Sequence, residues 1–405
     1  MKLNSYAAIE IDSLYAKLII AEMNKGNIHI IAALKGLVEG YEDGVIIDDE
    51  AFLTSILSLL QLADHKYKIK IDEIILVLPN ISHKVRMAGA NMAIQTPMHL
   101  ISMNEIKKIR NDCRNVALNE METAIDESPI SYTLDSGKTL YSIPLNIQSN
   151  TLQLTSYIHT LPTDFLKPLL NLLDQTKVDI IEAYLLPLAC YSMGLNDFNE
   201  NQSYLFIHYN YDALSIAYFE KNQLLKSSRI AFGEKTILES LMKQFNITKL
   251  EAIDLLDSYF LCDVNQATST YLDKDKKISE KTITECVLQS FEKGFEEIKK
   301  IVQEYSQTYH TNFEIKIMGK WLNYKNFLNY FNLSCQFNAQ AVYLNVLGLT
   351  SNEFISTYGA IVRFVLLNKD YILHREEDDN QKKNFNYTSK ESKQENKFVD
   401  IFDED

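Results

Sequence analysis

The sequence predicts a mixed α/β protein in which one structural unit, in the order βββαβ, occurs twice. Two observations lead to this prediction. Groups of three short segments rich in β-branched and aromatic residues occur near the start of the chain and again near its middle. A segment with helical periodicity and then a short, almost uniformly apolar segment follow each group in the same order. The repetition indicates a duplication of architecture.

The first copy of the unit occupies the start of the chain. We expect strands over residues 6–11, 16–22 and 28–37, because turn-forming residues separate these three segments. Residues 49–63 carry apolar side chains on one helical face, which predicts an amphipathic helix. Residues 73–79 form a nearly continuous apolar run, which predicts a buried strand.

The second copy repeats this order in the middle of the chain. Strands are expected over residues 204–209, 213–219 and 223–231, and a helix over residues 234–245. A short apolar strand over residues 314–318 completes the unit after a long helical region. The two copies therefore share the order of their elements and differ in the residues that form them.

An inserted module is expected between the two copies, over residues 81–159. Its central element is a helix over residues 104–118. Segments of β type over residues 130–134, 139–145 and 152–159 flank that helix, so the insert is expected to be a strand-helix-strand-strand module.

The remaining chain contains a long helix and a polar tail. Apolar side chains spaced by four and three residues predict a helix over residues 282–307, with Thr282 and Glu285 as its capping box. A further helix is expected over residues 323–330. Residues 375–405 are too polar to order themselves and are expected to be a disordered tail. The expected units are 1–80 with 160–198, 81–159, 199–232 with 312–374, 233–311, and the tail.

The charge balance excludes one broad class of function. The 405 residues include 40 Lys and Arg against 54 Asp and Glu, which gives a formal net charge of -14. A general nucleic-acid binder needs a surplus of basic residues on one face, so no nucleic-acid partner is expected. No run of about 18 apolar residues occurs, and we expect a cytoplasmic protein.

Cysteine, histidine and glycine usage excludes several kinds of site. The five cysteines are scattered without a CxxC pair, and the eight histidines show no HxxxH or HxH spacing, so no metal site is expected. Only 12 glycines occur, with no GG and no GxG. Rossmann, Walker and kinase-type phosphate loops need such glycines, because the backbone must approach the phosphate closely.

Three sequence segments, taken in order, resemble the family of the bacterial cell-division protein FtsA. They are IEIDSLYAKLIIAE at 9–22, GLVEGYEDGVIIDDEAFLTSILSLLQLAD at 36–64 and LEAIDLLDSYFLCD at 250–263. The inserted module also falls where this family has one, after residue 79. The resemblance runs over about residues 5–370. It implies an actin-like ATPase fold with duplicated βββαβ halves and an inserted SHS2 module.

The resemblance also implies a role in cell division. Proteins of the FtsA family bind the C-terminal peptide of the tubulin-like FtsZ, self-associate into polymers, and contact other division proteins through the SHS2 module. They link the division ring to the inner face of the cell membrane through a C-terminal amphipathic helix. Glu285 matches a position where the family presents an acidic residue to the FtsZ peptide. The other interpretation of Glu285 is a solvated capping-box residue.

The family binds ATP with Mg²⁺, and the matching residues here depart from its motifs. Asp12 stands where the family has a glycine in its first phosphate loop, and all three glycines of the second loop are replaced. The carboxylates of Asp12 and Asp212 would repel a polyphosphate, and His208 is a poor substitute for an oxygen ligand of Mg²⁺. We therefore expect weak or absent ATP binding and no enzyme activity; the alternative is a rearranged ATP site. The matching positions are Glu10, Asp12, Ser13, His208, Asn210, Tyr211, Asp212, Glu251, Gly319, Lys320 and Gly359.

The C-terminal segment KFVDIFDED leaves three interpretations open. Its apolar residues fall on one helical face, but acidic residues surround them where a membrane-binding helix would carry Lys or Arg. The segment is therefore expected to be a peptide that docks on a partner, a weak membrane contact, or an inert tail. The apolar residues are Phe398, Val399, Ile401 and Phe402.

Taken together, the sequence favours an FtsA-like, non-enzymatic adaptor that links FtsZ filaments to the membrane or to other division proteins. Two alternatives remain. One is a pilus-assembly scaffold of the PilM type, which shares the fold and the insertion. The other is an active ATPase or sugar kinase with the same fold, which the altered phosphate loops disfavour.

Overall fold

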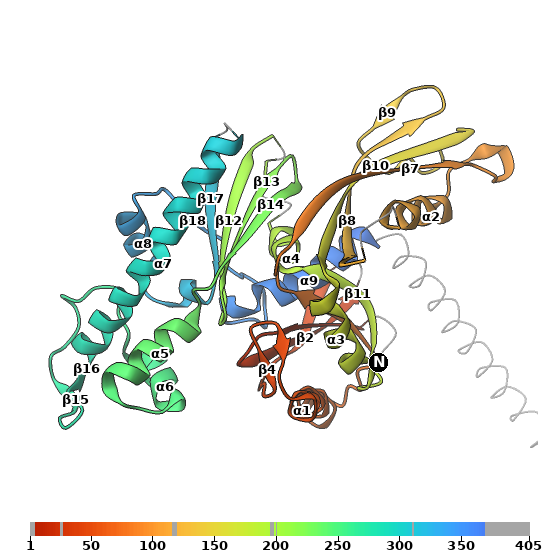
Figure 1. Ribbon diagram of the computed structural model, residues 1–405. Coiled ribbons are helices and arrows are strands. Elements are labelled where there is room, and N and C mark those ends of the chain that lie inside the picture. Colours follow the sequence, from red (N-terminus) through yellow and green to blue (C-terminus); the bar gives the residue numbers. More distant parts are fainter. Residues whose placement is uncertain are drawn as a thin grey trace, which may run out of the picture.

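The computed structural model describes residues 5–24, 27–115, 120–194, 198–199, 201–309 and 312–368. Its first half contains a five-stranded sheet with the strand order β11-β6-β1-β2-β3 (Figure 1). The first three strands form an antiparallel meander, and β6 and β11 continue the sheet in parallel on the side of β1. The strands are β1 (Ser5–Ile11), β2 (Tyr15–Asn24), β3 (Asn27–Leu37), β6 (Glu73–Leu78) and β11 (Asp179–Leu185).

The second half repeats this sheet with the order β14-β13-β12-β17-β18. Its meander is again antiparallel, and its last two strands again run parallel to the first strand. The predicted duplication of a βββαβ unit is therefore confirmed. The strands are β12 (Ser203–Tyr209), β13 (Leu214–Glu220), β14 (Gln223–Ile230), β17 (Phe313–Gly319) and β18 (Gln340–Ala341).

Helices of the first half cover its sheet because their apolar faces need burial. Helix α1 (Asp49–Tyr67) starts at the N-cap Asp48, whose carboxylate accepts a hydrogen bond from the Ala51 amide at 3.0 Å. Its buried residues Phe52 and Ile56 join the core of the first half. Two helices distant in sequence, α4 (Leu186–Ser192) and α9 (Ile355–Leu367), pack against each other, and α3 (Thr163–Asp174) lies near α1.

The second half carries a helical part whose longest helix is α7 (Glu280–Tyr309). The predicted four-and-three spacing is confirmed, since the apolar face of α7 is buried. The predicted capping box of Thr282 with Glu285 is wrong, because α7 begins earlier. Ser279 and Thr282 exchange the capping hydrogen bonds instead, at 2.9 and 3.2 Å. The other elements are α5 (Glu234–Phe245), α6 (Lys249–Tyr259), β15 (Tyr271–Asp273) and β16 (Ile278–Ser279).

The helix expected over residues 323–330 begins later than predicted. Residues Lys320–Asn323 form a 3-10 turn, η2, and α8 (Phe327–Cys335) follows it. Asn326, which precedes α8, has a left-handed backbone conformation with φ 63°. The chain therefore changes direction between the two elements, which a count of apolar residues does not reveal.

The insert forms a separate sheet with the order β7-β10-β8-β9 and its own small core (Figure 1). Helix α2 packs on this sheet and buries Ile106 and Ile109. The strand at residues 84–93 was not predicted, because its sequence KVRMAGANMA is rich in small residues of low strand propensity. The strand expected over residues 139–145 is only two residues long. The elements are β7 (Lys84–Ala93), η1 (Pro97–His99), α2 (Met103–Arg114), β8 (Glu122–Leu134), β9 (Thr139–Leu140) and β10 (Thr151–Pro162).

Polar contacts attach the insert to the rest of the molecule. Arg363 of α9 and Asp126 of β8 form a buried ion pair at 3.1 Å. His83 bridges the units: one ring nitrogen lies 2.8 Å from Ser227 Oγ of β14, and the other lies 3.1 Å from His159 of β10. The insert is therefore connected to both halves.

The predictions for the C-terminal tail, including Phe398, Val399, Ile401 and Phe402, lie outside the described residues. Within the described part of the chain, no helix has the length and apolar character needed to cross a bilayer. The 30-residue helix α7 is amphipathic.

Gly359 offers a test of the contact between α4 and α9. A Cβ atom at this position would lie 2.0 Å from the carbonyl oxygen of Ala189, which is backbone and cannot rotate away. We expect Gly359→Ala to lower the free energy of unfolding by about 2 kcal/mol or more in urea titrations. Gly89→Ala, whose new Cβ would meet its nearest atom at 3.5 Å, is the control and should stay within about 0.5 kcal/mol. Equal effects of the two substitutions would contradict this packing.

Candidate functional site

The candidate site lies where hairpin turns of the two halves face each other. Residues 12–14 connect β1 to β2, and residues 210–213 connect β12 to β13. Each turn follows the carboxyl end of a strand that pairs in parallel with a neighbouring strand, β1 with β6 and β12 with β17. Open α/β sheets bind ligands at the carboxyl ends of such strands. The turns touch directly, because the Ser13 amide donates a hydrogen bond to Asp212 Oδ2 at 3.0 Å.

Asp12 uses its carboxylate to satisfy the backbone of its own turn. Its Oδ1 accepts hydrogen bonds from the amides of Leu14 at 3.0 Å and Tyr15 at 2.7 Å. None of the residues in the two turns has a positive φ. The side chains that replace glycines are therefore accommodated without left-handed backbone.

Lys17 of β2 joins the two turns from within the protein. Its ammonium lies 2.9 Å from Asn210 Oδ1, 3.3 Å from Glu10 Oε1 and 3.4 Å from Asp12 Oδ2. Glu10 also accepts hydrogen bonds from the side-chain NH2 group of Asn210 and from the Ser356 hydroxyl. Sequence reasoning missed Lys17, although a lysine within the apolar strand segment AKLIIAE was a visible signal.

The charges in this cluster depend on one another. Burial raises the pKa of Asp12 and of Asp212; the Glu10 carboxylate raises the pKa of Asp12 further, and the Asp12 carboxylate raises the pKa of Asp212. Burial opposes the charge of Lys17, but the carboxylates of Glu10 and Asp12 outweigh it and raise the pKa of Lys17. The lysine therefore stays charged at neutral pH.

A short hairpin of the first half reaches across to the second half. It consists of β4 (Tyr41–Glu42) and β5 (Val45–Ile46). Asp43 at its tip forms an ion pair with Arg229 of β14, and Glu42 pairs with Lys235 of α5 at 2.5 Å. The Asp43 amide also donates to the Ser13 hydroxyl at 2.7 Å. The hairpin thus adds two ion pairs to the contact between the halves.

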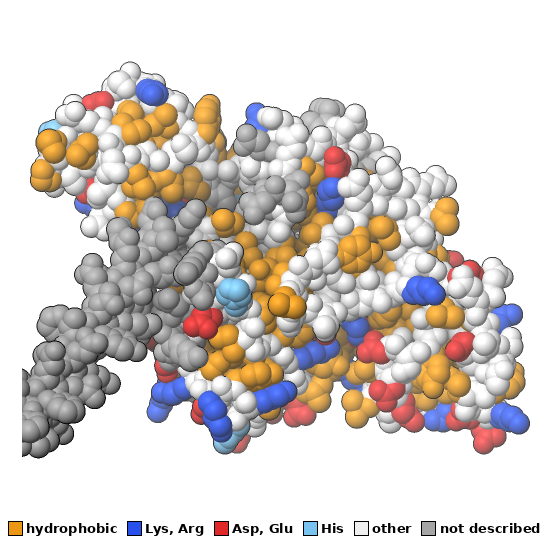
Figure 2. All heavy atoms as spheres, turned by 180° about the vertical axis from the view of Figure 1, so that it is seen from behind, with side chains coloured by type: hydrophobic (Ala, Val, Ile, Leu, Met, Phe, Trp, Pro, Cys, Tyr) orange, Lys and Arg blue, Asp and Glu red, His pale blue; other side chains and the backbone are white. Residues whose placement is uncertain are grey.

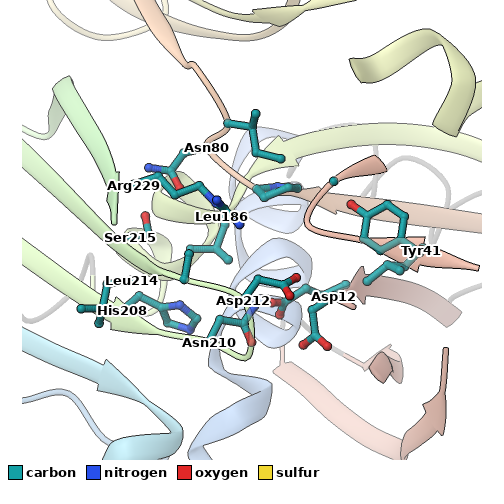
Figure 3. A pocket seen from close by; sticks show the side chains of 16 residues that line it. Asp12, Tyr41, Asn80, Leu186, His208, Asn210, Asp212, Leu214, Ser215 and Arg229 are labelled. Carbon is teal, nitrogen blue, oxygen red and sulfur yellow. Dashed lines mark hydrogen bonds between the residues drawn. The ribbon is translucent and has the colours of Figure 1, made fainter. Parts of the chain in front are cut away.

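A cavity of about 30 Å³ lies between the turns. Side chains of both halves line it, among them Asp12, His208, Asp212 and Arg229 (Figure 3). Asp12 Oδ2, Asp212 Oδ1 and both ring nitrogens of His208 have no hydrogen-bond partner among the described residues. Burial lowers the pKa of His208 to about 3, so its ring is neutral at neutral pH.

A second cavity, of about 20 Å³, is also lined by Asp12 and Asn210. Three lysines line it, and each is paired with a carboxylate. Besides Lys17, Lys35 pairs with Glu353 at 2.7 Å and Lys320 pairs with Glu234 at 2.9 Å. The lysine charges are therefore already neutralised within the chain.

The structure brings together most of the residues predicted for the nucleotide cleft. Glu10, Asp12, Ser13, His208, Asn210 and Asp212 meet at the facing turns. Tyr211 and Lys320 line the second cavity. Gly319 is the last residue of β17 and has a φ of 97°. A Cβ atom at this position would lie 2.5 Å from the carbonyl oxygen of Tyr209, so the position favours glycine.

Glu251 and Gly359 do not line either cavity. Glu251 is exposed and forms a capping box with Thr248, whose amide donates to it at 2.7 Å. Gly359 allows the close contact of α9 with α4. These roles concern the local stability of α6 and the packing of the first half.

Glu285 lies on the exposed face of α7, outside the cleft. The next residue, Cys286, lines an open groove of about 430 Å³ between α5 and α7. Exposed Lys243 and Lys293 contribute basic side chains from the two helices. The groove is thus polar and basic, and it adjoins Glu285, the residue predicted to contact a partner peptide.

The residues at the facing turns do not fit a nucleotide with Mg²⁺. Ligand pockets usually enclose about 300–1,000 Å³, whereas these cavities have room for about one or two water molecules each. The amides of residues 13–15 already donate to carboxylates. Within the described residues, no group of three or more His, Cys, Asp or Glu side chains is arranged to hold a metal ion.

Comparison with known proteins supports an actin-like fold. No family model matches the chain. The cell division protein FtsA of Streptococcus pneumoniae is 20% identical over 192 residues, which are 47% of this chain and 42% of that protein. FtsA of Bacillus subtilis is 20% identical over 236 residues, or 58% of this chain and 53% of that protein. The chain thus matches about half the length of these curated relatives.

Solved structures resemble a larger part of the chain. A chain of the PilM-PilN type IV pilus biogenesis complex aligns with a TM-score of 0.60 and 13% identity, covering 88% of this chain and 98% of that chain. MreB5 of Spiroplasma citri bound to AMPPNP aligns with a TM-score of 0.53 and 11% identity, and the alignment covers 92% of this chain and 99% of that chain. The chain has an actin-like fold, and the comparisons support a protein of the FtsA/PilM type.

Lys17→Met tests the buried charge cluster. It leaves Glu10 and Asp12 buried without their cation, so we expect the free energy of unfolding to fall by about 3–5 kcal/mol in urea titrations. Adding Glu10→Gln to Lys17→Met should restore part of this loss, because one uncompensated charge is removed. A double variant that is less stable than Lys17→Met would contradict the arrangement.

Buried histidines predict a loss of stability in acid. The pKa values of His83, His159 and His208 are lowered to about 3, whereas an unfolded histidine titrates near 6.5. The unfolded chain binds more protons between these values, so stability falls as pH drops from about 6.5 towards 3. Each histidine should cost about 2 kcal/mol at pH 5. His208→Leu should show a shallower decline between pH 7 and 5 than the parent protein, and an identical decline would contradict the burial of a neutral His208.

Proposed function

We propose that this chain is a non-enzymatic, FtsA-like adaptor whose actin-like fold works as a scaffold without a nucleotide. The observation that carries the proposal is the facing pair of turns, in which Asp12, Lys17 and Asp212 occupy the space between the halves. An ATPase cycle needs a cleft that admits polyphosphate and metal. The cleft of this chain instead contributes to the structure through its own ion pairs.

The partner we propose is the C-terminal peptide of FtsZ, as the similarity to FtsA suggests. The groove between α5 and α7 is the best candidate for the docking site. It is open, it adjoins Glu285, and Lys243 and Lys293 can bind acidic side chains or a terminal carboxylate of a peptide. Glu285 can in turn pair with a basic residue of the same peptide.

Contacts with further proteins and self-association are proposed for the insert. Several of its apolar side chains are exposed, and Figure 2 shows hydrophobic side chains gathered on its surface. Met87 and Met98 are each 72% exposed, and Tyr141 is 84% exposed. Exposed apolar side chains of this size support a surface that other proteins cover. Attachment to the membrane is proposed through the C-terminal segment that includes Phe398.

A pilus-assembly scaffold is the second candidate function. The observation that favours it is the alignment with the PilM-PilN complex, which covers nearly all of that chain. Both candidates use the fold as a scaffold, so they differ in the partner. A pulldown with an FtsZ C-terminal peptide and a pilin-assembly peptide separates them, and capture of the second peptide alone would replace the first proposal.

Nucleotide binding tests the scaffold proposal. MreB5 has been solved with AMPPNP and with ADP, so an active ATPase on this fold is the remaining alternative. We expect Mg·ATP at 1 mM to shift the melting temperature of this protein by less than about 1 °C, since a ligand far below its Kd adds almost no stability. Submicromolar ATP affinity in calorimetry, or hydrolysis above background, would overturn the proposal.

The basic groove makes a separate prediction. Lys243→Glu combined with Lys293→Glu should weaken binding of the FtsZ peptide at least tenfold in fluorescence anisotropy, because two attractive charges become repulsive. Lys299→Glu with Lys300→Glu, on the same helix α7 but outside the groove, makes the same change in net charge and is the control. An equal loss in both variants would indicate a general charge effect and would remove the groove as the docking site.

A further inference from the structure

We infer that the paired imidazoles of His83 and His159 form a pH-sensitive latch, which holds the insert against β14 of the second half at neutral pH and releases it when the solution is acidified. This inference goes beyond the proposed adaptor function, because it concerns the position of the insert and not the identity of a partner. The insert would separate from the second half at this contact, while the sheets themselves stay folded.

A chain of hydrogen bonds runs from the second half into the insert through the two rings. His83 Nδ1 lies 2.8 Å from Ser227 Oγ of β14, and His83 Nε2 lies 3.1 Å from His159 Nδ1. His159 Nε2 lies 3.2 Å from Ser128 Oγ of β8. The rings are also stacked, with 5.3 Å between their centroids and 28° between their planes. The two histidines therefore connect β14 to the interior of the insert.

Neighbouring hydrogen bonds on the same side come from groups that do not titrate. Asn80, which precedes β7, donates to Ser227 Oγ at 3.2 Å and to the carbonyl oxygen of Ser228 at 3.1 Å. Gln223 of β14 donates to the carbonyl oxygen of Pro129 at 2.9 Å. These bonds help to position β14 beside β7 (Figure 1). Of the hydrogen bonds described at this contact, only those of the histidine pair respond directly to pH.

The docked arrangement limits the number of protons that the pair can carry. A neutral imidazole has one N–H group and one bare nitrogen. The hydrogen bond between His83 Nε2 and His159 Nδ1 needs a proton on only one of these two atoms. If both rings were protonated, two N–H groups would face each other at 3.1 Å. The doubly protonated pair is therefore incompatible with docking.

An imidazolium at this place would also lack a free counter-ion. Asp126 of β8 favours the charged form of His83, but it is already paired with Arg363 of α9 at 3.1 Å. The other charged residues of β7, β8, β10, β14 and α9 are Lys84, Arg86, Glu122, Glu127, Lys226 and Arg229. Each of these is paired elsewhere, except the exposed Lys226. Every carboxylate on these five elements is therefore already occupied by a cation.

The direction of the pH effect follows from the environment of the rings. Burial lowers the pKa of both to about 3; His159 further opposes the charge of His83, and Arg363 opposes that of His159. A solvated histidine titrates near 6.5. The undocked state therefore binds more protons between these values, so docking is strongest above about pH 6.5 and weakens as pH falls. Each histidine should raise the ratio of undocked to docked protein about tenfold between pH 7.5 and 5.5.

The insert can separate from β14 without losing its own fold. Its sheet and α2 enclose a core of their own, which includes Ile106, Ile109 and Leu154. Its attachment to the first half is partly apolar, since Ile125 of β8 and Leu161 of β10 belong to the core of that half. Apolar burial does not depend on the protonation of histidine. Acid should therefore weaken the contact with β14 before the attachment to the first half.

The experiment follows the position of the insert in the full-length protein by single-molecule FRET. Tyr141 of the insert and Leu333 of α8 are 84% and 81% exposed, so Tyr141→Cys and Leu333→Cys carry the two dyes. The native cysteines are buried and should not react with the dyes. Far-UV circular dichroism of the same samples measures global unfolding between pH 7.5 and 4.

Two variants separate the latch from a general effect of acid. The test variant is His83→Gln with His159→Gln, which keeps polar side chains that do not titrate. The matched control is His208→Gln. His208 is also buried, and its pKa is also lowered to about 3, but it lies at the facing turns and not at the insert.

We expect the ratio of undocked to docked protein to rise about 100-fold in the labelled parent between pH 7.5 and 5.5, before the circular dichroism signal is lost, because two histidines take up protons. The control should rise equally, and the test variant should change less than about threefold. An insert that stays docked until the whole protein unfolds would overturn the inference. So would a test variant that undocks like the parent, or a control that loses the response.

His83→Gln alone decides if the double variant does not fold. One titrating histidine then remains, so the ratio should rise only about tenfold over the same pH range. A rise as large as that of the parent would contradict the latch. These measurements involve neither nucleotide nor partner peptide, so their outcome is independent of the tests of the proposed function.

Discussion

The buried ammonium of Lys17 is the polar contact that constrains the two facing turns of the molecule. It meets Glu10 and Asp12 of its own half and Asn210 of the other half at 2.9–3.4 Å, and it is almost completely shielded from solvent. Burying a charge is costly unless other groups compensate for it. The geometry of both turns is therefore constrained, because moving either turn away would leave a charge or an amide buried without a partner.

Apolar side chains also pack between the halves, since the ring of Tyr191 of α4 stacks on that of Phe219 of β13 with 4.1 Å between the ring centroids. Such apolar contacts add stability with little directional preference, whereas the hydrogen bond from Ser13 to Asp212 requires one register of the two turns. The ion pairs of Asp43 with Arg229 and Glu42 with Lys235 fix the same register from the outside. Because these outer pairs are partly exposed, they contribute less stability than the buried cluster and depend more on salt.

The sequence predicts the local elements better than the contacts between them. The helix at residues 234–245 and the meanders of both sheets follow from periodicity, which is a property of neighbouring residues. Asn210, the partner of Lys17 in the other half, lies 193 positions away, and no local pattern contains that information. Glu251 was assigned to the cleft from its alignment, but its position three residues after Thr248 was sufficient to predict a capping box. The strand at residues 84–93 was missed because its pairing with β10 outweighs its weak intrinsic propensity.

A cleft that is closed by its own side chains has a consequence for regulation. A ligand shifts a conformational equilibrium only by the difference in its affinity for the two states. In the scaffold that we propose, internal carboxylates occupy the amides of the turns, so closure would not depend on nucleotide concentration. Control of the proposed scaffold would then come from surfaces outside the cleft, such as the groove between α5 and α7 and the exposed apolar side chains of the insert. The insert is well placed for this, because Arg363 connects it to α9 of the first half and His83 connects it to β14 of the second. A partner that moves the insert would strain both connections at once, and so would act on both halves of the molecule.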